Sequence, residues 1–165
     1  MPITSWLTLY LREASIMDNR AVTLRTLVPG DRDDWKLLWR RYLSFYSTIR
    51  DDALYEHTFA RLTDSAYPAM CGFVAERNGR LVGIANCIVH DHGWYQQPML
   101  YLQDLYVDDL VRGQGIGRRL IEQVYHYADR EALAGVYWMT QSDNHQAMRL
   151  YDKIARKTDF IKYQR

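Results

Sequence analysis

Apolar side chains recur every three or four positions in four stretches of the chain. This spacing places them on one face of a helix, where they can be buried against a neighbouring element. The predicted helices cover residues 35–46, 53–62, 116–133 and 145–157. The first of them is the richest in tryptophan and tyrosine, so we expect its inner face to pack into a core.

Alternating or continuous apolar runs predict strands between and after these helices. The predicted strands cover residues 21–27, 72–76, 81–89, 100–107, 136–140 and 160–163. Asn78-Gly79 stands between the second and third strands and is a strong hairpin signal. The order β-α-α-β-β-β-α-β-α-β predicts a mixed sheet flanked by helices, an α/β (α+β) fold.

One domain accounts for most of the chain. The 165 residues are enough for a single substantial core, and no repeat or linker divides residues 21–165. Residues 1–20 contain no clear cap or turn that would organise them. We therefore expect an N-terminal extension or leader there, with Met17 as an alternative start.

Composition and charge exclude several classes of protein. The net charge of +1 provides no strongly basic field and argues against a general nucleic-acid-binding protein. No apolar stretch is long enough to span a membrane, and no secretory signal is recognisable, so a cytoplasmic location is the default expectation. Cys71 and Cys87 lie in strand-like segments without C-x-x-C spacing, which is typical of reduced core thiols. His90-Asp91-His92 lacks further ligand spacing, so we expect a surface loop and no metal site.

The most informative motif is the glycine-rich segment 112–117, between a predicted strand and a predicted helix. Glycines at such a junction leave backbone N–H groups uncovered at a helix N-terminus, which attracts phosphate. Arg118 stands where the dinucleotide-binding G-x-G-x-x-G motif requires its third glycine, and no Gly-Lys-Ser/Thr of a P-loop follows. The segment is therefore a candidate diphosphate site of another kind, with a ligand-free turn as the alternative.

Basic residues crowd the start of this predicted helix. Arg112, Arg118 and Arg119 lie near the positive end of the helix dipole, where acidic residues are normally preferred. Such crowding favours a bound anion unless Asp108 and Asp109 screen the charge. The alternative interpretation is a basic turn that is solvated and binds no anion.

Two motifs together resemble a known family. Arg112-x-x-Gly115-x-Gly117 resembles the Q/R-x-x-G-x-G/A signature of the GNAT superfamily of N-acetyltransferases. A second segment, which follows a strand and opens a helix, is similar to that family's second motif: Asn144-x-x-Ala147-x-x-Leu150-Tyr151. The closing run through Phe160 is similar to the family's final strand. The likeness covers residues 21–165, and the segment 102–107 resembles the branch of polyamine, diamine and histone-like acetyltransferases.

The resemblance implies a fold and a cofactor. The fold would be a mostly antiparallel sheet with a splayed pair of parallel strands, opened by a bulge near Leu105–Val107. Acetyl-coenzyme A would be the acetyl donor, with its diphosphate on the glycine turn and its pantetheine arm paired with the strand before it. The implied cofactor-binding residues are Leu105, Tyr106, Val107, Arg112, Gly113, Gln114, Gly115, Ile116, Gly117, Arg118, Asn144 and Tyr151.

The resemblance also suggests catalytic roles. Tyr151 matches the family's tyrosine near the coenzyme sulfur, so we expect it to be the general acid, with a core tyrosine as the alternative. Asn144 would orient the reaction centre, cap a helix, or do both. Gln103 stands where polyamine acetyltransferases have a glutamate, and an amide cannot take a proton. Asp104 is an unusual charge in an apolar strand, and it either serves the substrate or proton transfer or belongs to a structural ion pair.

The expected activity is acetyl transfer to a primary amine, by direct attack in a ternary complex. No cysteine is placed as an obvious acyl carrier. The residues expected to meet a cationic amine are Trp39, Tyr42, Gln103 and Asp104, although core packing is the leading explanation for the two aromatic ones. A small molecule is the favoured acceptor and a homodimer is possible. The alternatives are acetylation of a protein lysine or N-terminus, and a non-catalytic acyl-coenzyme A sensor.

Overall fold

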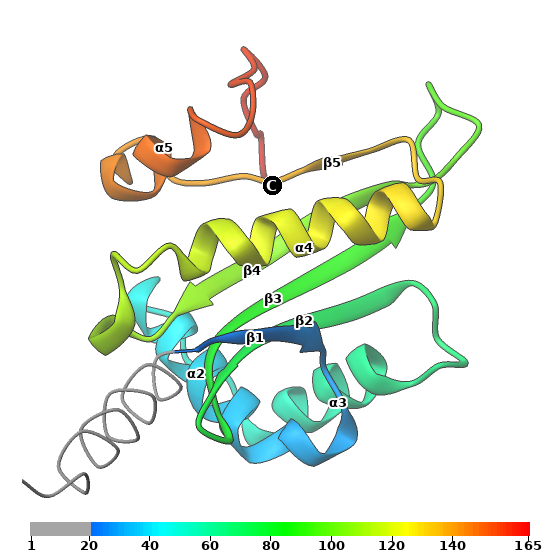
Figure 1. Ribbon diagram of the computed structural model, residues 1–165. Coiled ribbons are helices and arrows are strands. Elements are labelled where there is room, and N and C mark those ends of the chain that lie inside the picture. Colours follow the sequence, from blue (N-terminus) through cyan, green and yellow to red (C-terminus); the bar gives the residue numbers. More distant parts are fainter. Residues whose placement is uncertain (1–20) are drawn as a thin grey trace, which may run out of the picture.

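Five strands form one sheet, in which neighbours follow the order of the chain (Figure 1). The computed structural model describes residues 21–165, and the predicted N-terminal extension lies outside them. The strands are β1 (Thr23–Thr26), β2 (Met70–Arg77), β3 (Arg80–His90), β4 (Met99–Val107) and β5 (Gly135–Tyr137). The helices are α2 (Arg32–Phe45), α3 (Asp52–Thr63), α4 (Ile116–Arg130) and α5 (His145–Tyr151), with the short 3-10 turns η1 (Pro29–Asp31) and η2 (Asp109–Val111).

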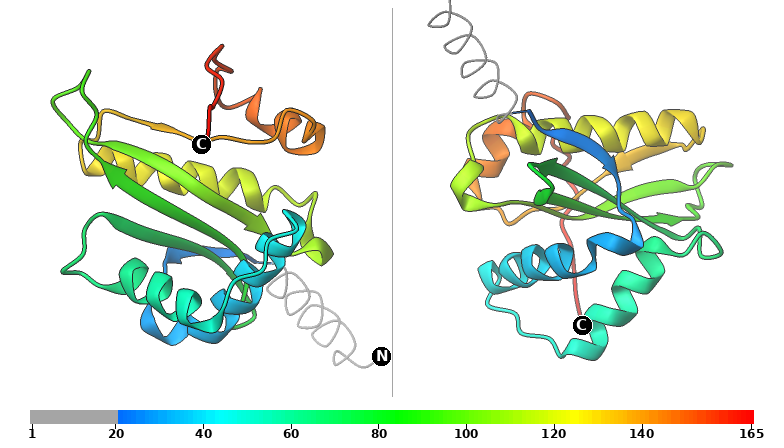
Figure 2. Two further views of the ribbon diagram at one scale, coloured as in Figure 1. Left: turned by 180° about the vertical axis from the view of Figure 1, so that it is seen from behind. Right: turned by 60° about the horizontal axis from the view of Figure 1, so that its bottom comes forward.

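The sheet is mixed and is covered on both faces. Strands β1 to β4 pair antiparallel, whereas β4 and β5 pair parallel. Helix α4 packs on one face, and α2 and α3 pack on the other (Figures 1 and 2). This arrangement confirms the predicted fold class.

Each helical layer buries a separate apolar core. The inward face of α4, which carries the predicted helical spacing, packs on the sheet through Ile116, Leu120, Ile121, Val124 and Ala128. On the opposite face, Trp35, Leu38 and Trp39 of α2 pack against Tyr55 and Phe59 of α3. Burying such side chains removes large apolar areas from water, which fixes both layers on the sheet.

A tight turn and a β-bulge in the sheet each depend on one or two residues. Asn78 and Gly79 have φ angles of 53° and 72°, the positive values that a tight two-residue hairpin requires, and they join β2 to β3 as predicted. In β4, Leu102 pairs with Cys87 and Asp104 pairs with Asn86, so Gln103 is the extra residue of a β-bulge. The bulge therefore lies earlier in the strand than the predicted position near Leu105–Val107.

The bulge decides which way Asp104 points. Leu100 and Leu102 belong to the core beneath α4, whereas Tyr106 belongs to the core beneath α2 and α3. Because side chains alternate along a strand, only an extra residue can move the even-numbered positions to the other face. Gln103 is that residue, and the carboxylate of Asp104 consequently lies under α2.

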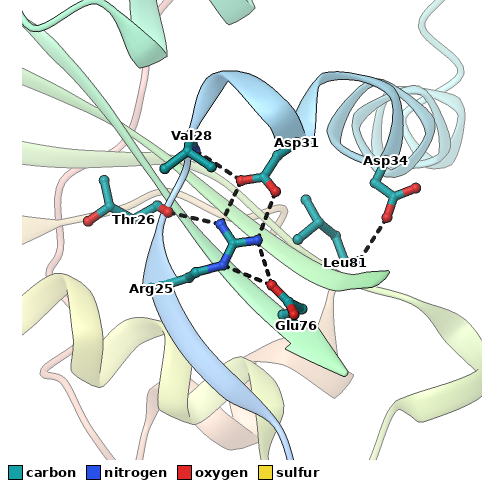
Figure 3. Close-up of polar contacts among 7 residues, drawn as sticks. All are labelled: Arg25, Thr26, Val28, Asp31, Asp34, Glu76 and Leu81. Atoms are coloured by element: carbon teal, nitrogen blue, oxygen red, sulfur yellow. Dashed lines mark hydrogen bonds and ion pairs between the residues drawn. The ribbon is translucent and has the colours of Figure 1, made fainter. Parts of the chain in front are cut away.

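An ionic cluster ties η1 to the sheet (Figure 3). The Arg25 guanidinium donates to Asp31 at 2.6 and 2.8 Å and to Glu76 at 2.9 and 2.6 Å. Nearby, the backbone N–H of Leu81 donates to Asp34 of α2 at 3.0 Å. These contacts set the position of α2, which carries residues of the site described below.

The C-terminal predictions need correction. The predicted strand over residues 160–163 is wrong, because this segment pairs with no strand in the described part of the chain. Helix α5 ends at Tyr151 rather than near Lys157, and β5 ends at Tyr137 rather than Thr140. A strand needs a neighbouring edge for its backbone N–H and C=O groups, and an apolar pattern alone does not supply one.

Candidate active site

The turn between β4 and α4 leaves a row of backbone N–H groups without protein partners. Gly113 and Gly115 have φ angles of 77° and 79°, the left-handed region that favours glycine. Within residues 21–165, the N–H groups of residues 115–118 donate to no protein acceptor, and that of Arg119 is the first to do so, to Gly115 at 3.1 Å. A helix start with exposed N–H groups fits the phosphates of a ligand.

The arginines near this turn already have partners. Arg112 pairs with Asp109 at 2.6 Å, and Arg118 pairs with Glu122 at 2.8 Å. Arg119 donates to a backbone carbonyl just before β1 at 2.8 Å. Acidic side chains therefore do screen part of the basic charge, and the argument for an anion depends on the N–H groups rather than on the arginines.

A pocket lies where β4 and β5 diverge. The two strands pair only at Met99–Tyr101 with Gly135–Tyr137, and the residues beyond them separate. The pocket is lined by Tyr42, Tyr46, Leu102, Gln103, Leu105, Trp138, Met139, Thr140 and Tyr151. From residue 102 onward, the edge of β4 that faces this gap pairs with no described strand, so an extended ligand arm can pair with it. Two carbonyls of this segment already accept side-chain hydrogen bonds, that of Gln103 from the Tyr42 hydroxyl at 3.5 Å and that of Val107 from the Arg112 guanidinium at 3.1 Å.

Tyr151 ends α5 and forms part of the pocket wall. Its ring packs edge-on against Trp138, with 5.3 Å between ring centroids. Burial, with a smaller contribution from the neighbouring Tyr46, raises the pKa of Tyr151 to about 12. The hydroxyl is therefore protonated at neutral pH. Because it has no hydrogen-bond acceptor among residues 21–165, it can donate to a ligand.

Asn144 caps the helix that carries Tyr151. Its Oδ1 accepts the Ala147 N–H at 3.3 Å, and its Nδ2 donates to Thr140 Oγ1 at 3.2 Å. The predicted helix-capping role is therefore confirmed. Asn144 does not itself line the pocket, but it connects the pocket-lining Thr140 to the first turn of the helix that carries Tyr151.

Asp104 is a buried carboxylate held by neutral donors. Its Oδ2 accepts the indole N–H of Trp39 at 3.1 Å, the Asn86 amide at 3.0 Å and the Gln103 amide at 3.5 Å. Asn86 is fixed in turn by the Trp35 indole N–H at 3.0 Å. No Lys or Arg among residues 21–165 forms an ion pair with Asp104, so the structural ion pair considered from the sequence is not found there.

Burial dominates the acid–base properties of this cluster. It raises the pKa of Asp104, although hydrogen bonds from Asn86 and Trp39 oppose the shift by stabilising the charged form. Burial, followed by the negative charge of Asp104, raises the pKa of Tyr42 well above its usual range. A carboxylate whose pKa moves upward toward neutrality is better suited to accept a proton from a substrate.

Of the four residues predicted to meet the substrate, two line the pocket and two are buried behind it. Tyr42 and Gln103 line the pocket, and Asp104 lies directly behind Gln103 in β4. Trp39 is 5% exposed and lies deeper, so its position supports a role in holding Asp104 rather than in touching a substrate.

Sequence reasoning assigned no role to Trp138, Met139 or Thr140. These pocket residues follow β5 directly, and the predicted strand had included them. The expected splay between the two parallel strands could have indicated them, because the residues that follow the last paired residue of each strand face the gap between the strands.

The two cysteines and the segment 90–92 lie outside the pocket lining. Cys71 and Cys87 are free and face each other across β2 and β3, in agreement with core thiols. His90 contacts the Tyr137 hydroxyl at 3.0 Å. Within residues 21–165, no group of three or more potential ligands could hold a metal ion, and no helix is long and apolar enough to cross a membrane.

Comparisons with known proteins agree with this geometry. A family model described as "Acetyltransferase (GNAT) family" matches residues 35–155. The D-amino-acid N-acetyltransferase HPA3 of Saccharomyces cerevisiae is 34% identical over 154 residues, which are 93% of this chain and 96% of that protein.

Solved structures with low sequence identity share the fold. AAC(6')-Iy in complex with the bisubstrate analog CoA-S-monomethyl-acetylneamine has a TM-score of 0.78 at 16% identity, covering 88% of this chain and 97% of that one. Ribosomal-protein-alanine N-acetyltransferase from Brucella melitensis biovar Abortus 2308 has a TM-score of 0.71 at 22% identity, covering 87% and 98%.

Proposed function

The chain belongs to the acetyltransferase (GNAT) family and is an N-acetyltransferase with acetyl-coenzyme A as donor, and from this premise we propose that its acceptor is the primary amine of a small molecule. The observation that carries this proposal is the pocket between the diverging ends of β4 and β5, which is lined by Tyr42 of α2 and by Tyr46 directly after that helix. Leu105 lines the pocket, and two residues later Val107 lies next to Gly117 in the first turn of α4. One ligand that follows the β4 edge can therefore bind both the pocket and the start of α4.

We assign the cofactor to the backbone of the glycine turn and to the β4 edge that no described strand covers. The N–H groups of the glycine turn, residues 112–117, hold the diphosphate, and the edge of β4 at Leu105–Val107 pairs with the pantetheine arm. The open space above Gly115, where an added methyl group would meet nothing within 4 Å, supports this placement. When bound, the cofactor supplies an acetyl group activated as a thioester.

The chain's own residues then have three tasks. Tyr151 is the general acid that donates a proton to the departing sulfur, and Asn144 positions it through the cap of α5. Asp104 receives the proton that the amine loses. Neither cysteine lines the pocket, which supports direct attack by the amine rather than an acyl-enzyme.

We propose an acceptor of the size of an amino acid. The relative that covers nearly the whole chain is named for acetylating D-amino acids. No Lys or Arg is among the pocket-lining residues, so the acceptor's amine rather than its carboxylate would enter. Gln103 in place of a glutamate makes a polyamine the less favoured substrate, although the segment 102–107 resembles that branch.

We further propose a cytoplasmic homodimer. The side chains of Phe160, Ile161 and Tyr163 are 83%, 74% and 87% exposed, which is a large apolar area for one surface segment. The outer edge of β5 is also unpaired among the described strands. Sedimentation velocity with and without residues 158–165 tests the assembly, and an unchanged monomer in both would contradict it.

A screen of amines tests the function. The purified protein is incubated with acetyl-coenzyme A and single D-amino acids, L-amino acids, polyamines or lysine peptides, and released coenzyme A is measured as free thiol. We expect the fastest turnover with a small amino acid. Gly115→Glu is the matched negative control, because its side chain and charge would occupy the phosphate position.

Each outcome has a distinct meaning. Faster turnover of a lysine peptide would identify a protein acetyltransferase. Tight binding of acetyl-coenzyme A without turnover of any amine would identify a sensor and overturn the proposal.

A further inference from the structure

Asp104 lies beside the pocket but does not line it. Its side chain is 6% exposed, and Gln103 and Tyr42 form the neighbouring part of the wall. Within residues 21–165, its Oδ2 collects the N–H donors of Trp39, Asn86 and Gln103, and none of these three donors is bonded to Oδ1. Asp104 therefore has an oxygen able to take a proton but no direct contact with a substrate in the pocket.

Of the two wall residues beside Asp104, only Tyr42 can carry a proton. The amide of Gln103 neither accepts nor releases one at neutral pH, whereas a phenol hydroxyl can do both. The Tyr42 hydroxyl lies 3.5 Å from the backbone oxygen of Gln103, over the peptide that leads into Asp104. Burial raises the pKa of Asp104, and a hydrogen bond from Tyr42 opposes this shift by stabilising the charged form, which places the hydroxyl within reach of both the carbonyl and the carboxylate.

We propose that Tyr42 is the proton relay between the acceptor amine in the pocket and the buried carboxylate of Asp104. This role deepens the proposed function and rests on it. It makes Tyr42 a catalytic residue, because the hydroxyl contacts the reacting amine directly. It also explains how a carboxylate sealed behind the pocket wall takes part in the reaction.

The proton transfers balance within one turnover. As the amine nitrogen bonds to the acetyl carbonyl carbon, its proton passes to Tyr42 Oη and the Tyr42 proton passes to Asp104 Oδ1. The C–S bond breaks, and the departing thiolate takes the proton of Tyr151. The proton then returns from Asp104 through Tyr42 to solvent in the emptied pocket, and solvent gives one to Tyr151, which restores both groups.

The neighbouring groups offer a matched control. Burial, followed by the negative charge of Asp104, raises the pKa of both Tyr42 and Tyr101, yet of these two only Tyr42 lines the pocket. Tyr101 stacks on Tyr137 with 5.0 Å between ring centroids. Tyr101→Phe therefore removes a hydroxyl near the same carboxylate without removing the relay.

A double-mutant cycle tests the relay in the full-length protein, with the fastest amine of the screen and saturating acetyl-coenzyme A. Tyr42→Phe should lower kcat by roughly 100-fold or more, the size of a general acid–base contribution. Asp104→Asn should cause a similar loss, and the double variant should lose little beyond either single one. Tyr101→Phe should stay within a few-fold of the wild type. Losses that multiply in the double variant would overturn the proposal.

A solvent isotope measurement separates proton transfer from packing. In mixtures of H₂O and D₂O, a relay that moves two protons in one step gives a curved dependence of kcat on the deuterium fraction. We expect curvature in the wild type and a straight line in Tyr42→Phe. Curvature that persists in Tyr42→Phe would assign the loss of activity to disturbed packing.

The relay and the proposed function fail in different ways. If the wild type acetylates no amine, the function is wrong. If it acetylates an amine and Tyr42→Phe keeps wild-type kcat, only the relay is wrong. Thermal melts and acetyl-coenzyme A affinity of every variant establish that each one folds and binds the donor.

Discussion

Gly115→Ala probes the proposed phosphate site with the smallest possible change. Gly115 has a φ of 79°, and an added Cβ would meet nothing within 4 Å. Steric clash with the protein therefore contributes nothing, and the cost to stability is the backbone strain of a left-handed alanine, about 1–2 kcal/mol. For a chain of this length, that cost lowers Tm by roughly 2–8 °C.

The effect on the cofactor should be separate from this strain. The new methyl group would occupy the open side of the turn, where the N–H groups of residues 115–118 have no acceptor in the described chain. Losing one charge-assisted hydrogen bond to a phosphate costs about 1.5–3 kcal/mol, which weakens binding by roughly 10–100-fold.

Gly79→Ala is the matched control. Gly79 has a φ of 72°, its Cβ would also meet nothing within 4 Å, and it belongs to the β2–β3 hairpin, which is joined to the glycine turn by the Arg77 side chain donating to the Gln114 side chain at 2.8 Å. Both variants should lose similar stability in thermal melts, whereas titration calorimetry with acetyl-coenzyme A should show weaker binding for Gly115→Ala alone. Equal affinity in the two variants and the wild type would refute the assignment of the diphosphate to this turn.

Three further predictions follow from side chains. Tyr151→Phe should lower kcat by roughly 10²–10⁴-fold with little change in donor affinity, and near-normal turnover with rate-limiting chemistry would leave Tyr151 a packing residue. Burial disfavours the charged form of Asp31, but hydrogen bonds from Arg25 and the Val28 N–H outweigh it and lower its pKa. Its stabilising contribution should be complete above the unfolded pKa of about 4 and be lost as pH falls through the folded value, so Arg25→Met should flatten the acid dependence of unfolding in denaturant titrations. Asn144→Ala should destabilise α5 by about 1 kcal/mol. Amide exchange in residues 145–151 should be faster in this variant than in the wild type, while exchange in α4 stays the same.

Local patterns in the chain were sufficient to predict most of the fold. The spacing of Ile116, Leu120 and Val124 predicted α4, and Asn78-Gly79 predicted the β2–β3 hairpin. Both signals act over a few residues, because one turn of helix or one hairpin selects its side chains and φ angles locally. The glycine turn was recognisable for the same reason, since positive φ at Gly113 and Gly115 is a property of the segment itself.

Contacts between distant residues could not be predicted in the same way. The segment 160–163 has a strand-like pattern but no partner among the described residues, because pairing depends on an edge elsewhere in the molecule. Trp39 has the helical spacing of a core residue, yet nothing in that spacing indicates that its N–H reaches Asp104, 65 positions later in the chain.

The sequence by itself determined the order of elements as far as α5, the glycine turn at a helix start and the presence of Tyr151, Asp104 and Asn144 in the family's pattern. Only the tertiary structure decided which way Asp104 points, because the extra residue Gln103 turns it under α2, away from the core of α4. There, one indole and two amides donate to a carboxylate that no cation neutralises within the described chain, and Tyr42 lines the pocket beside it. A β-bulge is defined by two strands together, so its position and the face it selects depend on the pairing of β4 with β3 and not on β4 alone.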